Sequence, residues 1–169
     1  MGMSPVGKLI YGYALGNSED GPLIREVNED GEWQTEWAIA LATDPDREHE
    51  DPDPFVHLEP ILKDAGLDVG AVYTNCALRL IHHGHLDYGY ATALVTYDVE
   101  AEWSEATAVD LPALDIMRQA QGWDDLLTQA IAVLGITPVE LARKEDNRWD
   151  HNAPRVPVPP RWMVVAQYI

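Results

Sequence analysis

The chain has 169 residues, 46% of them hydrophobic, and its 29 acidic and 11 basic residues give a formal net charge of −18. This size predicts one globular domain over residues 1–169. The charge argues against direct contact with nucleic acid or an anionic membrane, and no apolar stretch is long enough to cross a bilayer. The single cysteine, Cys76, excludes an intramolecular disulfide and a cysteine-rich zinc site, so we expect a cytoplasmic protein.

The first half of the chain predicts two strands, a loop and a helix. Alternating apolar residues predict strands over residues 8–15 and 35–42. Residues 43–54 combine three prolines with clustered acids, which predicts an exposed acidic loop. Apolar residues at helical spacing predict a helix over residues 54–65, with Gly66 as its C-terminal stop.

A β-hairpin is predicted at the centre of the chain. Residues 88–99 alternate and are rich in β-branched and aromatic side chains, which favours a strand. Residues 76–83 form a short apolar run that periodicity alone does not assign, and we interpret it as the partner strand because sequence neighbours usually pair. Residues 69–74 form a loop or a short extension, and residues 103–111 could add a shorter strand.

Helical spacing returns in the last third. It predicts helices over residues 111–120 and 123–134, and Thr137-Pro138-Val139-Glu140 has the spacing of a capping box that would open a third helix through about residue 144. A proline-rich, extended segment at about residues 152–161 leads into a last strand over 162–168.

These elements together predict an α+β fold. The expected sheet is mostly antiparallel, with about five strands near residues 8, 35, 76, 90 and 162. The expected helices, near residues 55, 112, 124 and 138, pack on one face of that sheet.

The acidic residues are unevenly distributed. Fourteen of them lie between Glu19 and Glu59, against two basic residues, Arg25 and Arg47. Two explanations are open: the charge keeps the protein soluble, or it attracts a basic partner, including one that normally holds DNA. On the second explanation, the candidate binding residues are the loop acids Asp44, Asp46, Glu48, Glu50, Asp51 and Asp53.

Three histidines and an aspartate lie at the tip of the predicted hairpin: His82, His83, His85 and Asp87. Imidazole and carboxylate groups are suitable ligands for zinc or a related cation, and residues 83, 85 and 87 would share a face of an extended strand. The alternative is a polar turn with partly exposed imidazoles, because Gly84 breaks the regular geometry.

Other catalytic motifs are not found in the sequence. Ser18 and Ser104 lie in no GxSxG elbow, and the glycines have no phosphate-binding spacing. Residues 123–144 have a faint helix-turn-helix pattern, but the surrounding acids and the net charge favour an ordinary helical hairpin packed on the sheet.

Four stretches resemble uncharacterised small acidic proteins of actinobacteria and their phages. They are Tyr11–Leu15 (YGYAL) with Glu19–Pro22 (EDGP), Glu102–Glu105 (EWSE), Gly122–Asp124 (GWD) through Leu134–Pro138 (LGITP), and Pro160–Trp162 (PRW). No activity is attached to that group. The resemblance implies a small accessory protein, on one view phage-borne, and it carries over no functional residue.

The leading hypothesis is therefore a non-enzymatic binding protein without a cofactor, whose acidic face engages a basic protein partner. If the protein is phage-borne, binding of its acidic face to a DNA-binding partner would be DNA mimicry. The alternative is a metal-dependent enzyme using His83, His85 and Asp87, and a third hypothesis is assembly through exposed sheet edges. The sequence assigns neither the identity of the partner nor the oligomeric state.

Overall fold

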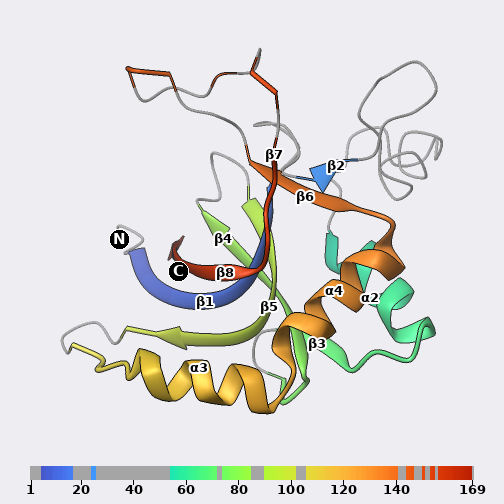
Figure 1. The fold of residues 1–169 in the computed structure, drawn as a ribbon, viewed down its shortest axis with the longest axis horizontal. Coiled ribbons are helices and arrows are strands. Elements are labelled where there is room, and N and C mark those ends of the chain that lie inside the picture. Colours follow the sequence, from blue (N-terminus) through green and yellow to red (C-terminus); the bar gives the residue numbers. More distant parts are fainter. Residues whose placement is uncertain are drawn as a thin grey trace.

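The computed structural model describes residues 5–16, 24–25, 54–71, 74–84, 90–101, 106–140, 144–146, 150, 153–154 and 156–168. The fold is α+β, as the sequence predicts (Figure 1). The elements are β1 (Pro5–Gly16), β2 (Ile24–Arg25), α2 (Pro54–Asp64), β3 (Val69–Ala71), β4 (Leu78–Gly84), β5 (Tyr90–Glu100), α3 (Leu111–Ala120), α4 (Trp123–Leu134), β6 (Thr137–Glu140), β7 (Val156–Pro157) and β8 (Arg161–Tyr168).

The main sheet has five strands in the order β3-β4-β5-β1-β8. The predicted hairpin is confirmed, because β4 and β5 pair antiparallel, and the predicted first and last strands are confirmed as β1 and β8. The fifth strand differs from the expected one: it is β3, which pairs parallel with β4. The strand predicted over residues 35–42 lies outside the described residues.

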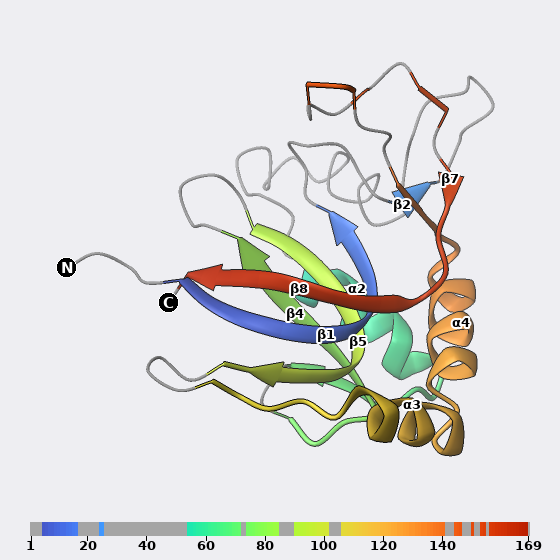
Figure 2. The same ribbon diagram turned by 60° about the vertical axis from the view of Figure 1, so that its left-hand side comes forward.

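The sheet curls until β8, the strand at one end, meets β4, the second strand from the other end. Gly84 at the end of β4 pairs with Gln167 of β8, although two other strands separate β4 from β8 in the sheet order. Figure 2 shows β1, β5 and β8 bending around a common interior. We call this side of the sheet the inner face, defined by a buried cluster of Ile10, Ile81, Ala93, Val95 and Val165.

The opposite side, the outer face, carries the helices and the larger core. Leu58 and Leu62 of α2 and Leu127 and Ala130 of α4 pack there against buried sheet residues such as Leu94. The prediction that the helices cover one face of the sheet is therefore confirmed. Within the part of the chain that the structure describes, no helix is long and apolar enough to cross a membrane.

Local sequence signals account for the ends of the helices. Asp110 caps α3 because its carboxylate accepts a hydrogen bond from the backbone N–H of Ala113 at 3.1 Å. Gly66 follows α2 with φ +83°, and Gly135 ends α4 with φ 66°, a left-handed conformation in which glycine is favoured. These predicted boundaries are confirmed.

Two predicted elements are wrong where the structure describes them. Residues 106–110 form no strand, because Asp110 already serves as the cap of α3. The helix predicted to start at Thr137 is instead the strand β6, which pairs with β2 and with β7 from the proline-rich segment. Burial of Val139 between these neighbours outweighs the local capping signal, and the helix-turn-helix alternative loses its second helix.

Candidate functional site

The predicted acidic binding residues, Asp44 through Asp53, lie outside the described residues, as does residue 43, whereas Pro54, the last residue of the predicted loop, is the first residue of α2. The site can therefore be built only from the curled sheet and its helices. Two groups of charged and aromatic side chains stand out there, one on each face of the sheet.

The histidine cluster is divided between the faces. Successive side chains of a strand point to opposite sides, so His82 and His83 of β4 cannot both face one metal ion. His83 shares the inner face with Ile81, and burial lowers its pKa to about 4, with a smaller effect from His82. Its Nε2 atom has no hydrogen-bond partner among the described residues. His85 and Asp87 lie outside the described residues, and the described ones contain no group of three potential metal ligands.

Two ion pairs also lie on the inner face. Lys8, whose side chain is only 2% exposed, lies with its Nζ 3.2 Å from an oxygen of Glu100, the residue opposite it on β5. Arg79 of β4 places its Nε 3.0 Å from Asp98 of β5. Because buried charges are costly unless paired, these contacts keep cations in the curled sheet without creating a positive surface.

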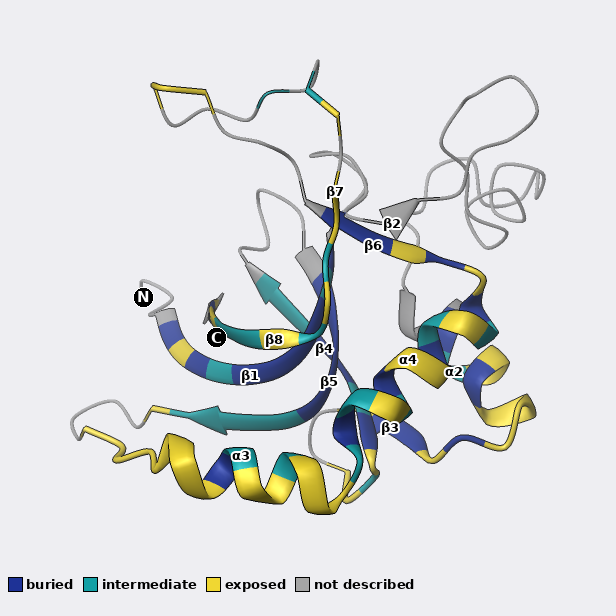
Figure 3. Cartoon of the chain, in the orientation of Figure 1, coloured by how far each residue is buried: buried dark blue, intermediate teal, exposed yellow. Residues whose placement is uncertain are grey.

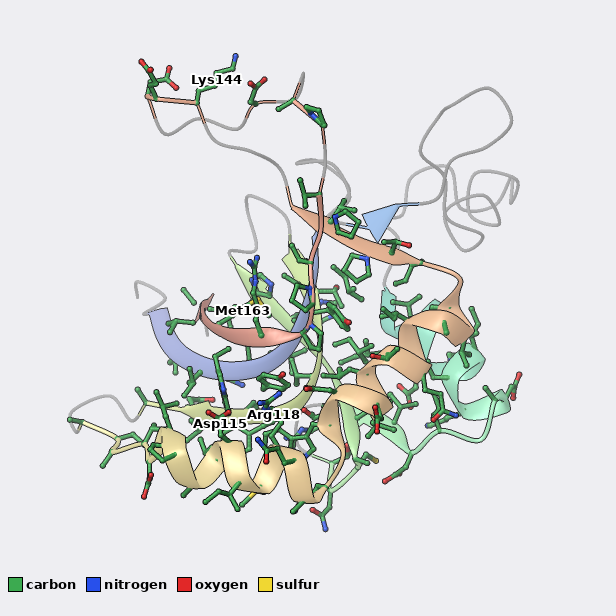
Figure 4. The ribbon with its side chains drawn as sticks, in the orientation of Figure 1. Asp115, Arg118, Lys144 and Met163 are labelled. Atoms are coloured by element: carbon green, nitrogen blue, oxygen red, sulfur yellow. The ribbon has the colours of Figure 1, made fainter. Side chains whose placement is uncertain are left out.

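A hydrogen-bonded network joins the outer face to the helices. The Tyr11 hydroxyl donates to Asp124 Oδ1 of α4 at 2.6 Å. Arg118 of α3 donates from Nη1 both to the same hydroxyl, at 3.2 Å, and to Asp124 Oδ2, at 2.5 Å. Its Nε lies 3.3 Å from Asp115 Oδ1. Figure 4 shows Asp115 and Arg118 on the side of α3 that faces the sheet.

The Tyr11 ring of this network packs in a cluster with three further aromatic rings, those of Tyr97, Trp123 and Trp162. Tyr97 stacks on Trp123 with ring centres 5.6 Å apart, and the ring centres of Tyr11 and Trp162 are 4.9 Å apart. The indole N–H of Trp162 donates to Asp115 Oδ1 at 3.4 Å. These rings hold α3 and α4 against strands β1, β5 and β8, because they bury apolar surface and pack in preferred relative orientations.

The protonation states in this network do not favour catalysis. Burial raises the pKa of Tyr11 to about 12, and the hydrogen bond to Asp124 adds to the shift. The hydrogen bond to Tyr11 raises the pKa of Arg118, and burial raises that of Tyr13. A phenol that stays protonated at neutral pH acts as a hydrogen-bond donor, not as a base or nucleophile. The network is therefore suited to positioning α3 and α4.

The sequence contained a weak signal for the charged group on the inner face. Lys8 and Ile10 are two residues apart on one strand, so a cation on an apolar face already required a carboxylate near it. The network of Tyr11, Arg118 and Asp124 left no such signal, because its members are far apart in the chain.

Replacing Asp124 with asparagine should destabilise the protein by about 1 kcal/mol, because a half-exposed ionic contact to Arg118 becomes neutral. The matched control is Asp125→Asn, which also removes an acid from the first turn of α4 at an exposed position. It should cost about 0.5 kcal/mol or less. Urea unfolding followed by tryptophan fluorescence compares them, and equal losses would show that the contact contributes nothing.

Comparison of the chain with family models, curated proteins and solved structures finds no match.

Proposed function

We propose that this protein is a small, non-enzymatic binding protein that engages a basic protein partner through its negative charge. The net charge of −18 supports this proposal, because a field of that size attracts cationic surfaces and accelerates their association. The concentration of acids between residues 19 and 59 makes the loop 43–54 the first candidate contact, through Asp44, Asp46, Glu48, Glu50, Asp51 and Asp53.

The observation that carries the proposal is that four of the described cations are already paired with carboxylates. Lys8, Lys63, Arg79 and Arg118 each lie within ion-pair distance of a carboxylate. These four cations therefore offer no basic patch to nucleic acid. Among the described acids, the exposed ones are Asp64, Asp68, Asp110, Asp125, Glu145 and Asp146. Asp115 and Asp124 remain about half exposed even though both contact Arg118.

The more specific form of the proposal is mimicry of DNA by a phage-borne, cytoplasmic protein. A partner that normally binds phosphates through lysine and arginine would bind the spaced carboxylates instead, and its complex would weaken as salt screens the charges. A competition experiment with DNA would identify mimicry, because a DNA duplex should displace the protein from a partner that normally binds DNA.

Affinity capture from lysate at about 50 mM and about 500 mM salt tests the proposal. A basic protein should be retained at low salt and released at high salt. The loop variant E48Q/E50Q/D51N should retain less of it than the control D64N/E145Q/D146N, which loses the same charge from exposed positions elsewhere. Failure to recover any basic protein at low salt would contradict the proposal.

A metal-dependent function is the second candidate, favoured by the chemistry of His83. Its imidazole is neutral at neutral pH, the form that binds metal, and its Nε2 has no described hydrogen-bond partner. Metal analysis of untagged protein tests this candidate. Stoichiometric metal that is lost in an H83A/H85A variant would support it, whereas a metal-free, equally stable protein would contradict it.

A further inference from the structure

Helix α3 is packed with its charged side inward. Asp115 and Arg118, its two charged residues, turn toward the sheet (Figure 4). There they contact Trp162 and Tyr11 of the sheet, and Arg118 also contacts Asp124 of α4. Leu114 is the only residue of α3 that is buried. An amphipathic helix in a soluble domain normally has the opposite orientation, with apolar residues on the core and charges in water.

The side of α3 that faces away from the sheet is apolar. Ala113, Ile116, Met117 and Ala120 recur at the i, i+3, i+4, i+7 spacing that usually marks a core-facing stripe, yet all four are exposed. Ile116 is 70% exposed and Met117 is 40% exposed. We call these four residues the α3 face. Figure 3 shows α3 as mostly exposed along the edge of the molecule.

Composition alone does not explain this orientation. Turning α3 about its axis would bury Ile116 and Met117 and place Asp115 and Arg118 in water, although it would also expose Leu114. The bonds of Arg118 to Tyr11 and Asp124 hold the helix in the other orientation. Val109 and Leu111, near the N-terminus of α3, are also 37% and 47% exposed.

Carboxylates border this apolar surface. Asp110 lies at the N-terminus of α3, and exposed Asp125 follows the turn at its C-terminus. Asp115 and Asp124 are about half exposed, and Arg118, the cation between them, already bonds to both. An apolar stripe with a negative border is complementary to a segment that has apolar residues on one side and lysine or arginine beside them.

We infer that the α3 face docks an amphipathic basic helix of the partner protein. The partner's apolar side chains pack on Ile116 and Met117, and its lysine or arginine residues reach the exposed Asp110 and Asp125. This inference rests on the proposed function and names a contact surface for it. A second copy of the chain fits poorly, because it brings another charge of −18 and its Arg118 is already paired.

Two synthetic peptides test the inference: an 18-residue lysine–leucine amphipathic helix, and the same peptide with every leucine replaced by serine. The leucine peptide should bind the wild-type protein more tightly than the serine peptide at about 50 mM salt. The variant I116S/M117S should weaken binding of the leucine peptide by about tenfold or more, because two apolar contacts are lost, and should leave binding of the serine peptide unchanged.

The control variant I61S/V156S removes two exposed apolar residues from other elements and should bind both peptides as the wild type does. Equal binding of the leucine peptide by the wild type and I116S/M117S would overturn docking on α3 but leave the basic-partner function standing. Binding of neither peptide would overturn both. Sedimentation of the wild type alone should show a monomer, and a dimer that I116S/M117S dissociates would assign the α3 face to a second copy instead.

Discussion

Replacing Gly12 with alanine should destabilise the protein by about 4 kcal/mol or more, enough to unfold a marginal domain. Gly12 has φ +156°, and a Cβ atom built there would lie 2.0 Å from the carbonyl oxygen of Leu94 and 2.8 Å from Cα of Val95. Both contacts are to the backbone of the neighbouring strand in the middle of the sheet, so neither can be relieved by moving a side chain.

The reason for this close approach is a β-bulge. Tyr11 is opposite Tyr97 but Gly12 is opposite Val95, so Thr96 is an extra residue on β5. The bulge bends β5 against β1, which suits the curvature of the sheet around its inner face.

Gly7→Ala, in the same strand, is the matched control. A Cβ atom at Gly7 meets nothing within 4 Å, so this substitution should change the free energy of unfolding by about 1 kcal/mol or less. Urea unfolding and far-UV circular dichroism of the two variants make the comparison. A Gly12→Ala protein as stable as Gly7→Ala would contradict the described register.

His83 should make the protein less stable in mild acid. Burial lowers its pKa from 6.5 to about 4, so the unfolded chain binds a proton between these values more readily than the folded one. The contribution of this pKa shift to the free energy of unfolding is complete above pH 6.5 and is lost as the pH falls toward 4. We expect about 2 kcal/mol of this contribution to be lost between pH 7.5 and pH 5.

The variant His83→Gln should remove this part of the pH dependence, and His82→Gln, which changes the neighbouring residue on the other face, should keep most of it. Unfolding free energies at pH 7.5 and 5 measure the difference between the variants. An NMR titration should show that one of the six histidines has a pKa near 4 and that its signal disappears in His83→Gln. A normal titration for all six would contradict burial of His83.

The orientation of α3 links the outer-face network to binding. The contacts that hold Arg118 and Asp115 against the sheet are the same contacts that keep Ile116 and Met117 in solvent. An Asp124→Asn protein that lost peptide affinity together with stability would show this coupling directly.

The spacing and type of the residues were sufficient to predict a strand or a helix where one local pattern dominated. Strands β1 and β5 alternate, β8 follows an extended proline-rich segment, and α2, α3 and α4 have apolar spacing with a cap or a glycine at their ends, so they could be predicted. The strand β6 could not, because its capping-box spacing was a valid local signal that pairing with β2 and β7 overrode.

The sequence by itself determined the α+β class, the acidic excess and the main strand and helix segments, because these depend on residue type and on spacing within a few turns. Only the tertiary structure decided that the sheet closes through Gly84 and Gln167, that His82 and His83 face opposite sides, and that α3 turns its charges inward. Each of these depends on contacts between residues distant in the chain, and such contacts leave no periodic pattern in a single sequence.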